Sequence, residues 1–297
     1  MLSQSPPMTS VLNYAFVQIK SFGDLTISLA ALRRLSAEDL AQCCVVLSPH
    51  LKDLYQALSP AYALEILDIP DQNVPAIFDV KKRGPMAALL SAMTLRRSLA
   101  SSAPGATLVM ERMTARERFV VGRRTGVGLP HEDNVYLAYE RFLSEIFTLR
   151  NSALPQVNVA GTSRRIAVCP LSRVAAKNIP LSLILNMADV CHRAGFEIEL
   201  LLLEGEPFDI PNALPTRVIA RRFDALASAL TSYAGVISAD SLPAHLAEYR
   251  GRPAFVATPV QNTYWLPEQA YKSAHWGLFE QRADLTTRLL HFLDSIS

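Results

Sequence analysis

Short apolar runs with strand character alternate with amphipathic helical segments along most of the 297 residues. Alternation at this spacing predicts parallel sheets covered by helices, an α/β fold. In the first half we expect strands at residues 13–20, 43–47, 64–69, 77–80 and 107–110, and helices from Asp24 and at 50–58, 86–99 and 135–147. In the second half we expect strands at 166–171, 197–203, 217–220, 235–238 and 254–257, and helices at 180–194, 224–233, from near Pro243, and at 285–296.

The stretch from residue 150 to residue 163 is polar and lacks regular apolar spacing, which is typical of a domain boundary. We therefore expect two domains, 1–153 and 154–297, each long enough to bury its own core. The simplest architecture is a pair of Rossmann-like domains that face each other across a cleft. Whether the last helix packs back on the N-terminal domain stays open.

Charge and cysteine content narrow the function classes. The chain has 29 basic and 27 acidic residues, a net charge of +2, which is too balanced to indicate nucleic-acid binding by itself. Its 4 cysteines have no C-x-x-C spacing and are expected to be buried thiols in a reducing compartment. We find no secretion signal and no run of about 18 apolar residues, so we expect a cytoplasmic protein. A peripheral membrane contact stays open, although no segment of the sequence is an evident anchor for it.

The most informative stretch runs from Tyr233 to Pro267. A strand ends in the polar turn Asp240-Ser241, and a helix begins near Pro243, so free backbone N–H groups are expected where the turn meets the helix. Helix N-termini of this kind bind phosphate. His245 lies within the first helical turn, so a carboxylate and an imidazole are expected to face one ligand.

Polar side chains also follow two other strands of the C-terminal half. Ser172 and Lys177 precede a helix whose entry is set by Pro180, so a hydroxyl and an ammonium group can reach one diphosphate. A single lysine in a loop is more often simply exposed to solvent. The second predicted phosphate-binding turn, at Asp240, favours a phosphate-binding role for Lys177. Glu206, with Glu204 as the alternative, follows a buried strand, where carboxylates accept ribose hydroxyls. A carboxylate in a turn also needs no ligand to explain it.

In the N-terminal half, Asp24 begins a helix at the carboxyl end of the first strand, where ligands bind in open α/β sheets. An aspartate at a helix start more often caps the helix, and the two roles compete without excluding each other. The arginine-rich run 112–124 is usually a solvated face. If the run lines the cleft, Arg112, Arg116 and Arg118 are candidate acceptor contacts, because guanidinium groups suit phosphorylated sugars.

These stretches resemble the family 9 glycosyltransferases, the heptosyltransferase-like enzymes. DSLPAHLA, GRP and WLP, between residues 240 and 267, follow that family's pattern D-S/T-G-x-x-H-L-A, G-x-P and W; AKNIP at 176–180 follows A-K-x-W-P, and Gly23-Asp24 follows its G-D element. Three positions depart from the pattern: Leu242 replaces a glycine, Ile179 replaces a tryptophan, and Ala30 stands where proline is common. The resemblance covers most of the C-terminal half and the first 35 residues, whereas 36–150 match only in rhythm.

The resemblance implies the GT-B fold and an inverting glycosyltransferase that moves a sugar from a nucleotide diphosphate, usually ADP-heptose, to a saccharide or glycolipid such as a lipopolysaccharide core. Asp24 would be the catalytic base, and Lys177 would neutralise the leaving diphosphate. No metal or other cofactor is required where a lysine and a helix N-terminus stabilise that charge. The implied donor contacts are Ser172, Glu206, Asp240, Ser241 and His245.

Other classes stay open. Leu242 and Ile179 are compatible with a non-catalytic binding protein of this fold whose donor site has degenerated, and binding of ADP and ADP-sugars would distinguish it from an enzyme. A nucleic-acid binder that uses the arginine run predicts steeply salt-dependent affinity, but the balanced charge argues against a nucleic-acid partner. A glycosyltransferase with a GDP- or UDP-linked donor is a variant within the same class.

Overall fold

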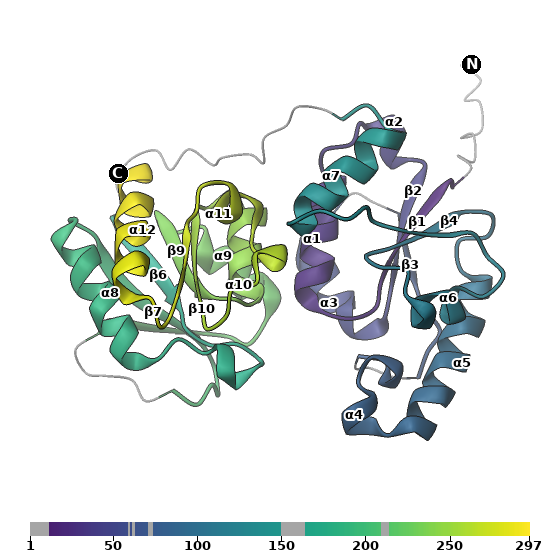
Figure 1. Ribbon diagram of the computed structural model, residues 1–297, viewed down its shortest axis with the longest axis horizontal. Coiled ribbons are helices and arrows are strands. Elements are labelled where there is room, and N and C mark those ends of the chain that lie inside the picture. The colour runs from purple at the N-terminus through teal and green to yellow at the C-terminus, as the bar shows by residue number, and fades with distance from the viewer. Residues whose placement is uncertain (1–11, 59, 61–62, 71–73, 150–163, 209–213) are drawn as a thin grey trace, which may run out of the picture. The chain divides into compact units, whose positions relative to one another are not determined.

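The computed structural model describes residues 12–58, 60, 63–70, 74–149, 164–208 and 214–297 (Figure 1). The chain forms two compact units. The expected domain boundary, between residues 153 and 154, lies outside the described residues. The first unit comprises Met1–Ser28, Leu32–Pro130 and Phe142–Arg150, and the second comprises Leu29–Ala31, His131–Arg141 and Asn151–Ser297.

The first unit is built on a five-stranded parallel sheet in the order β3-β2-β1-β4-β5. Its strands are β1 (Tyr14–Gln18), β2 (Cys43–Leu47), β3 (Ala63–Ile66), β4 (Thr107–Met110) and β5 (Gly126–Gly128). The helices of this half are α1 (Phe22–Leu32), α2 (Ala37–Leu40), η1 (Pro49–Leu51), α3 (Lys52–Leu58), η2 (Ala76–Phe78), α4 (Val80–Arg83), α5 (Pro85–Ser101), α6 (Ala115–Val121) and α7 (Val135–Ile146).

The second unit repeats this plan with a six-stranded parallel sheet in the order β11-β10-β9-β6-β7-β8. Its strands are β6 (Arg165–Cys169), β7 (Glu197–Leu203), β8 (Thr216–Ile219), β9 (Gly235–Ala239), β10 (Ala254–Thr258) and β11 (Trp276–Leu278). Its helices are η3 (Ala175–Lys177), α8 (Leu181–Arg193), α9 (Phe223–Leu230), α10 (Leu242–Tyr249), η4 (Thr263–Trp265), α11 (Glu268–Lys272) and α12 (Arg282–Ser295). Both strand orders are of the doubly wound Rossmann type, which confirms the predicted α/β class.

Alternating side chains along β10 bury against two different helix layers. Phe255 and Ala257 join the core cluster that α8 and α12 cover, whereas Val256 packs with Ala244 and Ala270 from α10 and α11. Figure 1 shows these two helix pairs on opposite faces of the second sheet. Successive residues of a strand point to opposite faces, so a strand buried on both sides is a continuous apolar run.

The first sheet is covered in the same way. Ala15 and Val17 of β1 pack in one cluster with Leu95 of α5, while the ring of Phe16 meets Phe142 of α7 edge to face at 6.4 Å between ring centroids. The predicted burial of the cysteines is confirmed, since all four are free and buried. Burial is the largest cause that raises the pKa of the Cys43 thiol to about 12.

Two local predictions are wrong. Residues 77–80, predicted as a strand, belong to η2 and the start of α4, because Ala76 and Ile77 bury beside α5 as a helical turn. A short, mainly apolar segment does not distinguish a strand from a buried turn. The first helix begins at Phe22 rather than at Asp24, since Ser21 supplies the cap. The sequence interpretation also missed α2, β5, α6, α11 and β11.

Candidate functional site

The order of the second sheet reverses between β6 and β9, and polar side chains from the loops after both strands meet there. Lys177, at the end of η3, places its Nζ 2.6 Å from Oδ2 of Asp240, the first residue after β9. The Asp240 side chain is 8% exposed and that of Lys177 is 30% exposed. Loops diverge at such a reversal and leave room for a ligand at the carboxyl ends of the strands.

The loop that carries Lys177 is fixed by its own hydrogen bonds. Ile179 N–H donates to Pro170 O at 2.9 Å, and Ser172 N–H donates to Asn178 Oδ1 at 2.8 Å. Ser172 Oγ in turn accepts from Val174 N–H at 3.3 Å. Ile179, which stands where the resembling family has tryptophan, is buried in the core beneath α8. This departure therefore fills the core and does not reach the ligand edge as a side chain.

The N-terminus of α10 presents backbone amides at the same edge. Ser241 is the N-cap residue, but its hydroxyl donates to Leu171 O at 3.2 Å and to Ala239 O at 3.3 Å, so it ties the two loops together instead of capping the helix. Pro243 has no N–H, and Ala244 N–H donates to Ser241 O. Of the backbone amides that the structure describes at the start of α10, those of Ser241 and Leu242 are therefore the ones available to donate to an anion.

Leu242 occupies its position without backbone strain. Outside glycine, the described residues show positive φ only at Ala103 and Ala274. Leu242 is the first residue of α10 and is half-buried. A glycine is therefore not required here for its left-handed conformation, and its replacement alters only the bulk beside the helix N-terminus.

His245 lies beneath this edge rather than on it. The side chain is buried, Nδ1 lies 3.0 Å from the hydroxyl of Tyr136, and the two rings stack with centroids 6.1 Å apart. Burial, outweighing the opposite effect of Asp240, lowers the His245 pKa from 6.5 to about 4. The imidazole is therefore neutral near pH 7. Its proposed contact with a donor stays a prediction.

The segment that supplies Tyr136 was not predicted as part of this site. Asn134 is fully buried, and its Nδ2 donates to Thr263 O at 3.0 Å and to Leu266 O at 2.9 Å, while its Oδ1 accepts from Tyr136 N–H. Asn134 thus caps α7 and fastens the start of that helix to the loop around η4. An asparagine before a helix signals the cap, but no local pattern indicates partners about 130 residues away.

Glu206 lies nearer the site than Glu204. Its Oε2 accepts from Leu203 N–H at 2.8 Å, and after burial its charge is the cause that raises the pKa of Cys169, the last residue of β6, to about 12. Glu204 is exposed, and its main-chain O accepts from Arg221 Nε at 3.0 Å. The ribose-binding role of Glu206 stays a prediction.

In the first unit, Asp24 belongs to a reciprocal cap. Asp24 N–H donates to Ser21 Oγ at 3.2 Å, and Ser21 N–H donates to Asp24 Oδ2 at 3.2 Å. This is the capping box of helix α1. The pKa of Glu111, which follows β4, is raised mainly by burial. The nearby negative charge of Asp24 contributes to the same rise. The capping role is present, and the role as a base stays a prediction.

Charged side chains surround the strand reversal of the first sheet, between β1 and β4; of these, Lys20, Glu111 and Glu117 were not predicted. Lys20 Nζ lies 3.4 Å from Oε1 of Glu117, whose side chain is buried. Arg116 Nη2 lies 3.1 Å from the same oxygen, and Arg112 Nε lies 3.0 Å from Glu111 Oε1. Burial would raise the Glu117 pKa, but the Thr114 hydroxyl and the two cations outweigh it and lower that pKa.

The arginine-rich run is only partly a solvated face. Arg118 and Arg123 are exposed, as expected. Arg124 is half-buried, which corrects the interpretation at this position. Its guanidinium group donates to the main-chain oxygens of four residues that follow or end α5, namely Leu99, Ser102, Ala103 and Ala106.

Each unit therefore gathers its own predicted residues. Ser172, Lys177, Asp240 and Ser241 meet at one edge of the second sheet, with His245 below them and Glu206 after the neighbouring strand. Asp24, Arg112 and Arg116 lie at the corresponding edge of the first sheet. No three His, Cys, Asp or Glu side chains that the structure describes are grouped as a metal site, and none of its helices is long and apolar enough to cross a membrane.

No protein-family model and no curated protein matches the sequence. Solved structures match it over nearly its whole length. The glycosyl transferase family 9 protein from Veillonella parvula DSM 2008 is 13% identical, with 94% of this chain and 97% of that chain covered and a TM-score of 0.58. E. coli heptosyltransferase WaaC with ADP is 11% identical, with 96% and 100% covered and a TM-score of 0.58.

A third match is E. coli ADP-heptose lps heptosyltransferase II, which is 14% identical, with 96% of this chain and 98% of that chain covered and a TM-score of 0.52. Identity this low is informative about the fold and not about the reaction. The two parallel sheets agree with these matches. The chain has the α/β GT-B fold of the family 9 heptosyltransferase structures.

Proposed function

We propose that this protein transfers a sugar, heptose in the first instance, from a nucleoside diphosphate to a hydroxyl of a saccharide acceptor. The observation that supports this most is the Lys177–Asp240 pair, with 2.6 Å between Nζ and Oδ2, beside the uncapped N-terminus of α10. An ammonium group and backbone amides at one strand reversal suit a diphosphate. Structures of this fold contain ADP and ADP-2-deoxy-2-fluoro heptose, so we propose an ADP-linked donor.

Lys177 would act mainly on the leaving group. As the bond between the anomeric carbon and the diphosphate oxygen breaks, the electron pair goes to that oxygen and negative charge grows there. Lys177 and the amides of Ser241 and Leu242 would stabilise the growing charge more than the ground state, which accelerates the reaction. Asp240 would hold the ammonium group in place before the donor binds. The hydroxyl of Ser172 would contact a phosphate of the donor, and the carboxylate of Glu206 would contact its ribose.

Asp24 would accept the proton of the acceptor hydroxyl while the acceptor oxygen bonds to the anomeric carbon from the opposite face, with inversion. Glu111 is the rival base, because burial raises its pKa and a raised pKa suits a general base. Arg112, Arg116 and Arg118 are the proposed contacts for a phosphorylated acceptor.

The donor site is tested by calorimetry with ADP, GDP, UDP and ADP-heptose. Lys177→Ala should weaken ADP binding by about 10-fold to 100-fold, the value of a hydrogen bond to a charged group. Lys272→Ala is a matched control, because Lys272 Nζ also lies 2.6 Å from a buried carboxylate, that of Glu268 on α11. Equal ADP affinity in the two variants, or no nucleotide binding by the wild type, would overturn the proposed site.

Transfer itself is tested by mass spectrometry of a saccharide acceptor incubated with ADP-heptose. Asp24→Asn should abolish the product and keep ADP binding, whereas Glu111→Gln should keep both. Loss of transfer in Glu111→Gln alone would move the base to Glu111. A wild type that binds no ADP or ADP-heptose and transfers no sugar would favour the non-catalytic binding protein with a degenerated donor site, the alternative that the bulk of Leu242 beside the phosphate amides supports.

A further inference from the structure

Helix α5 is apolar on both of its faces. Ala88, Ala92, Leu95 and Leu99 are buried on the inner face. The outer face exposes Met86 (68%), Leu89 (51%), Leu90 (60%) and Met93 (43%), which recur at the spacing of one helical stripe. A helix that covers a sheet needs only one apolar stripe, so the second stripe has no role in the fold of the unit.

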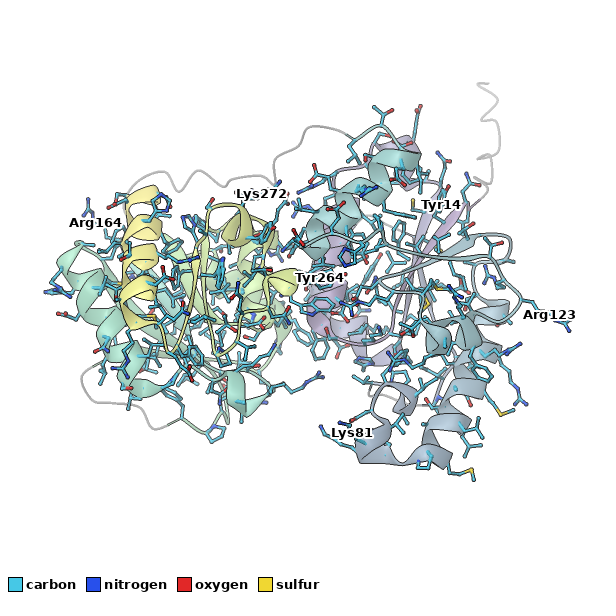
Figure 2. All side chains as sticks on the ribbon, viewed as in Figure 1. Tyr14, Lys81, Arg123, Arg164, Tyr264 and Lys272 are labelled. Carbon is cyan, nitrogen blue, oxygen red and sulfur yellow. The ribbon has the colours of Figure 1, made fainter. Side chains whose placement is uncertain are left out.

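Basic side chains border this outer stripe. Lys81, Lys82 and Arg83 of α4 are exposed directly before α5, and exposed Val80 precedes them. No aspartate or glutamate occurs from residue 80 to residue 110, whereas Arg96 and Arg97 add to the basic residues there. Figure 1 shows α4 and α5 side by side at one end of the first unit, and Figure 2 labels Lys81 on α4. We name the exposed residues of 80–93 the α4–α5 patch.

A cavity of about 330 Å³ adjoins the α4–α5 patch. Leu90 and Arg83 line it together with Ile69, Ala87 and Leu95. In the second unit, by contrast, α8 exposes only the pair Leu181 and Leu185 (36% and 40%), and the other exposed large apolar residues, Val174, Val218, Val260 and Leu290, lie on separate elements. The patch therefore combines contiguous apolar side chains, an adjoining apolar cavity and a basic rim.

We propose that the α4–α5 patch docks on the surface of an anionic lipid bilayer. A helix with Leu and Met on one side and Lys or Arg at its border lies in the interface, with the apolar stripe among the acyl chains and the cations at the anionic headgroups. The absence of acidic residues over 80–110 fits such a surface; the carboxylate of Asp79, directly before the patch, lies 3.9 Å from Lys82 Nζ, which offsets its charge. This inference does not depend on the proposed sugar transfer.

Co-sedimentation of the full chain with vesicles tests the electrostatic part. We expect binding to vesicles of equal parts phosphatidylcholine and phosphatidylglycerol, weaker binding to phosphatidylcholine alone, and loss of binding as NaCl is raised. Each basic residue near an anionic surface raises the partition coefficient onto the vesicles about fivefold. The triple variant Lys81→Glu, Lys82→Glu, Arg83→Glu should therefore lower that coefficient by at least about 100-fold. The matched control, with the same change of net charge on exposed residues elsewhere, is Lys52→Glu, Arg123→Glu, Arg282→Glu.

The apolar part is tested with Leu89→Glu, Leu90→Glu against Val218→Glu, Val260→Glu, a pair with similar exposure in the second unit. The first variant should lose vesicle binding and the second should keep it, with circular dichroism spectra unchanged in both. Equal binding by the patch variants and their controls would overturn the proposal, as would equal binding to neutral and anionic vesicles. The wild type could instead bind no vesicles and self-associate in light scattering. If only the patch variants abolished that self-association, the α4–α5 patch would be assigned to contact with a second copy of the chain.

Discussion

Replacing Lys177 should expose an asymmetry in the pair it forms with Asp240. In Lys177→Ala the carboxylate of Asp240 keeps its charge at a site where it is 8% exposed, whereas in Asp240→Asn the ammonium group of Lys177, 30% exposed, can still turn to water. The buried partner therefore suffers more from losing its counterion than the exposed partner does. Lys177→Ala should be the more destabilising change, and adding Asp240→Asn to it should restore stability.

The size of the effect follows from the distance and the exposure. With 2.6 Å between Nζ and Oδ2, the attraction at an effective dielectric constant of about 20 is about 6 kcal/mol before the cost of desolvation is subtracted. Breaking a fully buried pair costs about 3–5 kcal/mol, and an exposed pair contributes about 0–1 kcal/mol. Because Lys177 is partly exposed, we expect Lys177→Ala to lower the free energy of unfolding by about 1–3 kcal/mol, and Asp240→Asn by less than about 1 kcal/mol.

Tryptophan fluorescence measures this directly. The 2 tryptophans of the chain, Trp265 and Trp276, both belong to the second unit, so their emission reports the unit that contains the pair. In a thermal scan the midpoint should fall by about 2–12 °C in Lys177→Ala, since 1 kcal/mol shifts a unit of this size by about 2–4 °C. An unchanged midpoint, or a double variant no more stable than Lys177→Ala, would refute the argument.

Three other outcomes are expected. Asp24→Asn should still cap helix α1, so calorimetry should show that the free energy of unfolding of the first unit falls by less than about 1 kcal/mol while sugar transfer is lost. The His245 pKa is about 4 in the folded chain and ordinarily 6.5, so the contribution of His245 to the free energy of unfolding should be full above pH 6.5 and fall by up to about 3 kcal/mol toward pH 4. His245→Asn should flatten this pH dependence of the midpoint measured by fluorescence. An unaltered slope would contradict the assignment to His245. Arg124→Ala should cost about 2–4 kcal/mol because buried carbonyls lose their donor, whereas the exposed neighbour, changed as Arg123→Ala, should stay within about 0.5 kcal/mol in the same calorimetric scan.

The sequence by itself determined the class of fold and the position of most strands. The bounds of β2, β4 and β7 agree with prediction because β2 and β4 are short, mainly apolar runs and β7 ends in four leucines, a pattern that depends on neighbours in the chain. The same local pattern located the loops that follow β6 and β9, where Lys177 and Asp240 lie. Which polar residues follow a strand is thus decided locally.

Partners were decided only by the tertiary structure. Lys177 meets Asp240 across 63 residues because the strand order brings β6 beside β9, and Tyr136 meets His245 across 109 residues within the second unit. The structure also buries Arg124 among carbonyls and leaves the outer face of α5 uncovered. Periodicity states which side of an element is apolar, but only packing determines whether another element, or nothing in the described chain, covers that side.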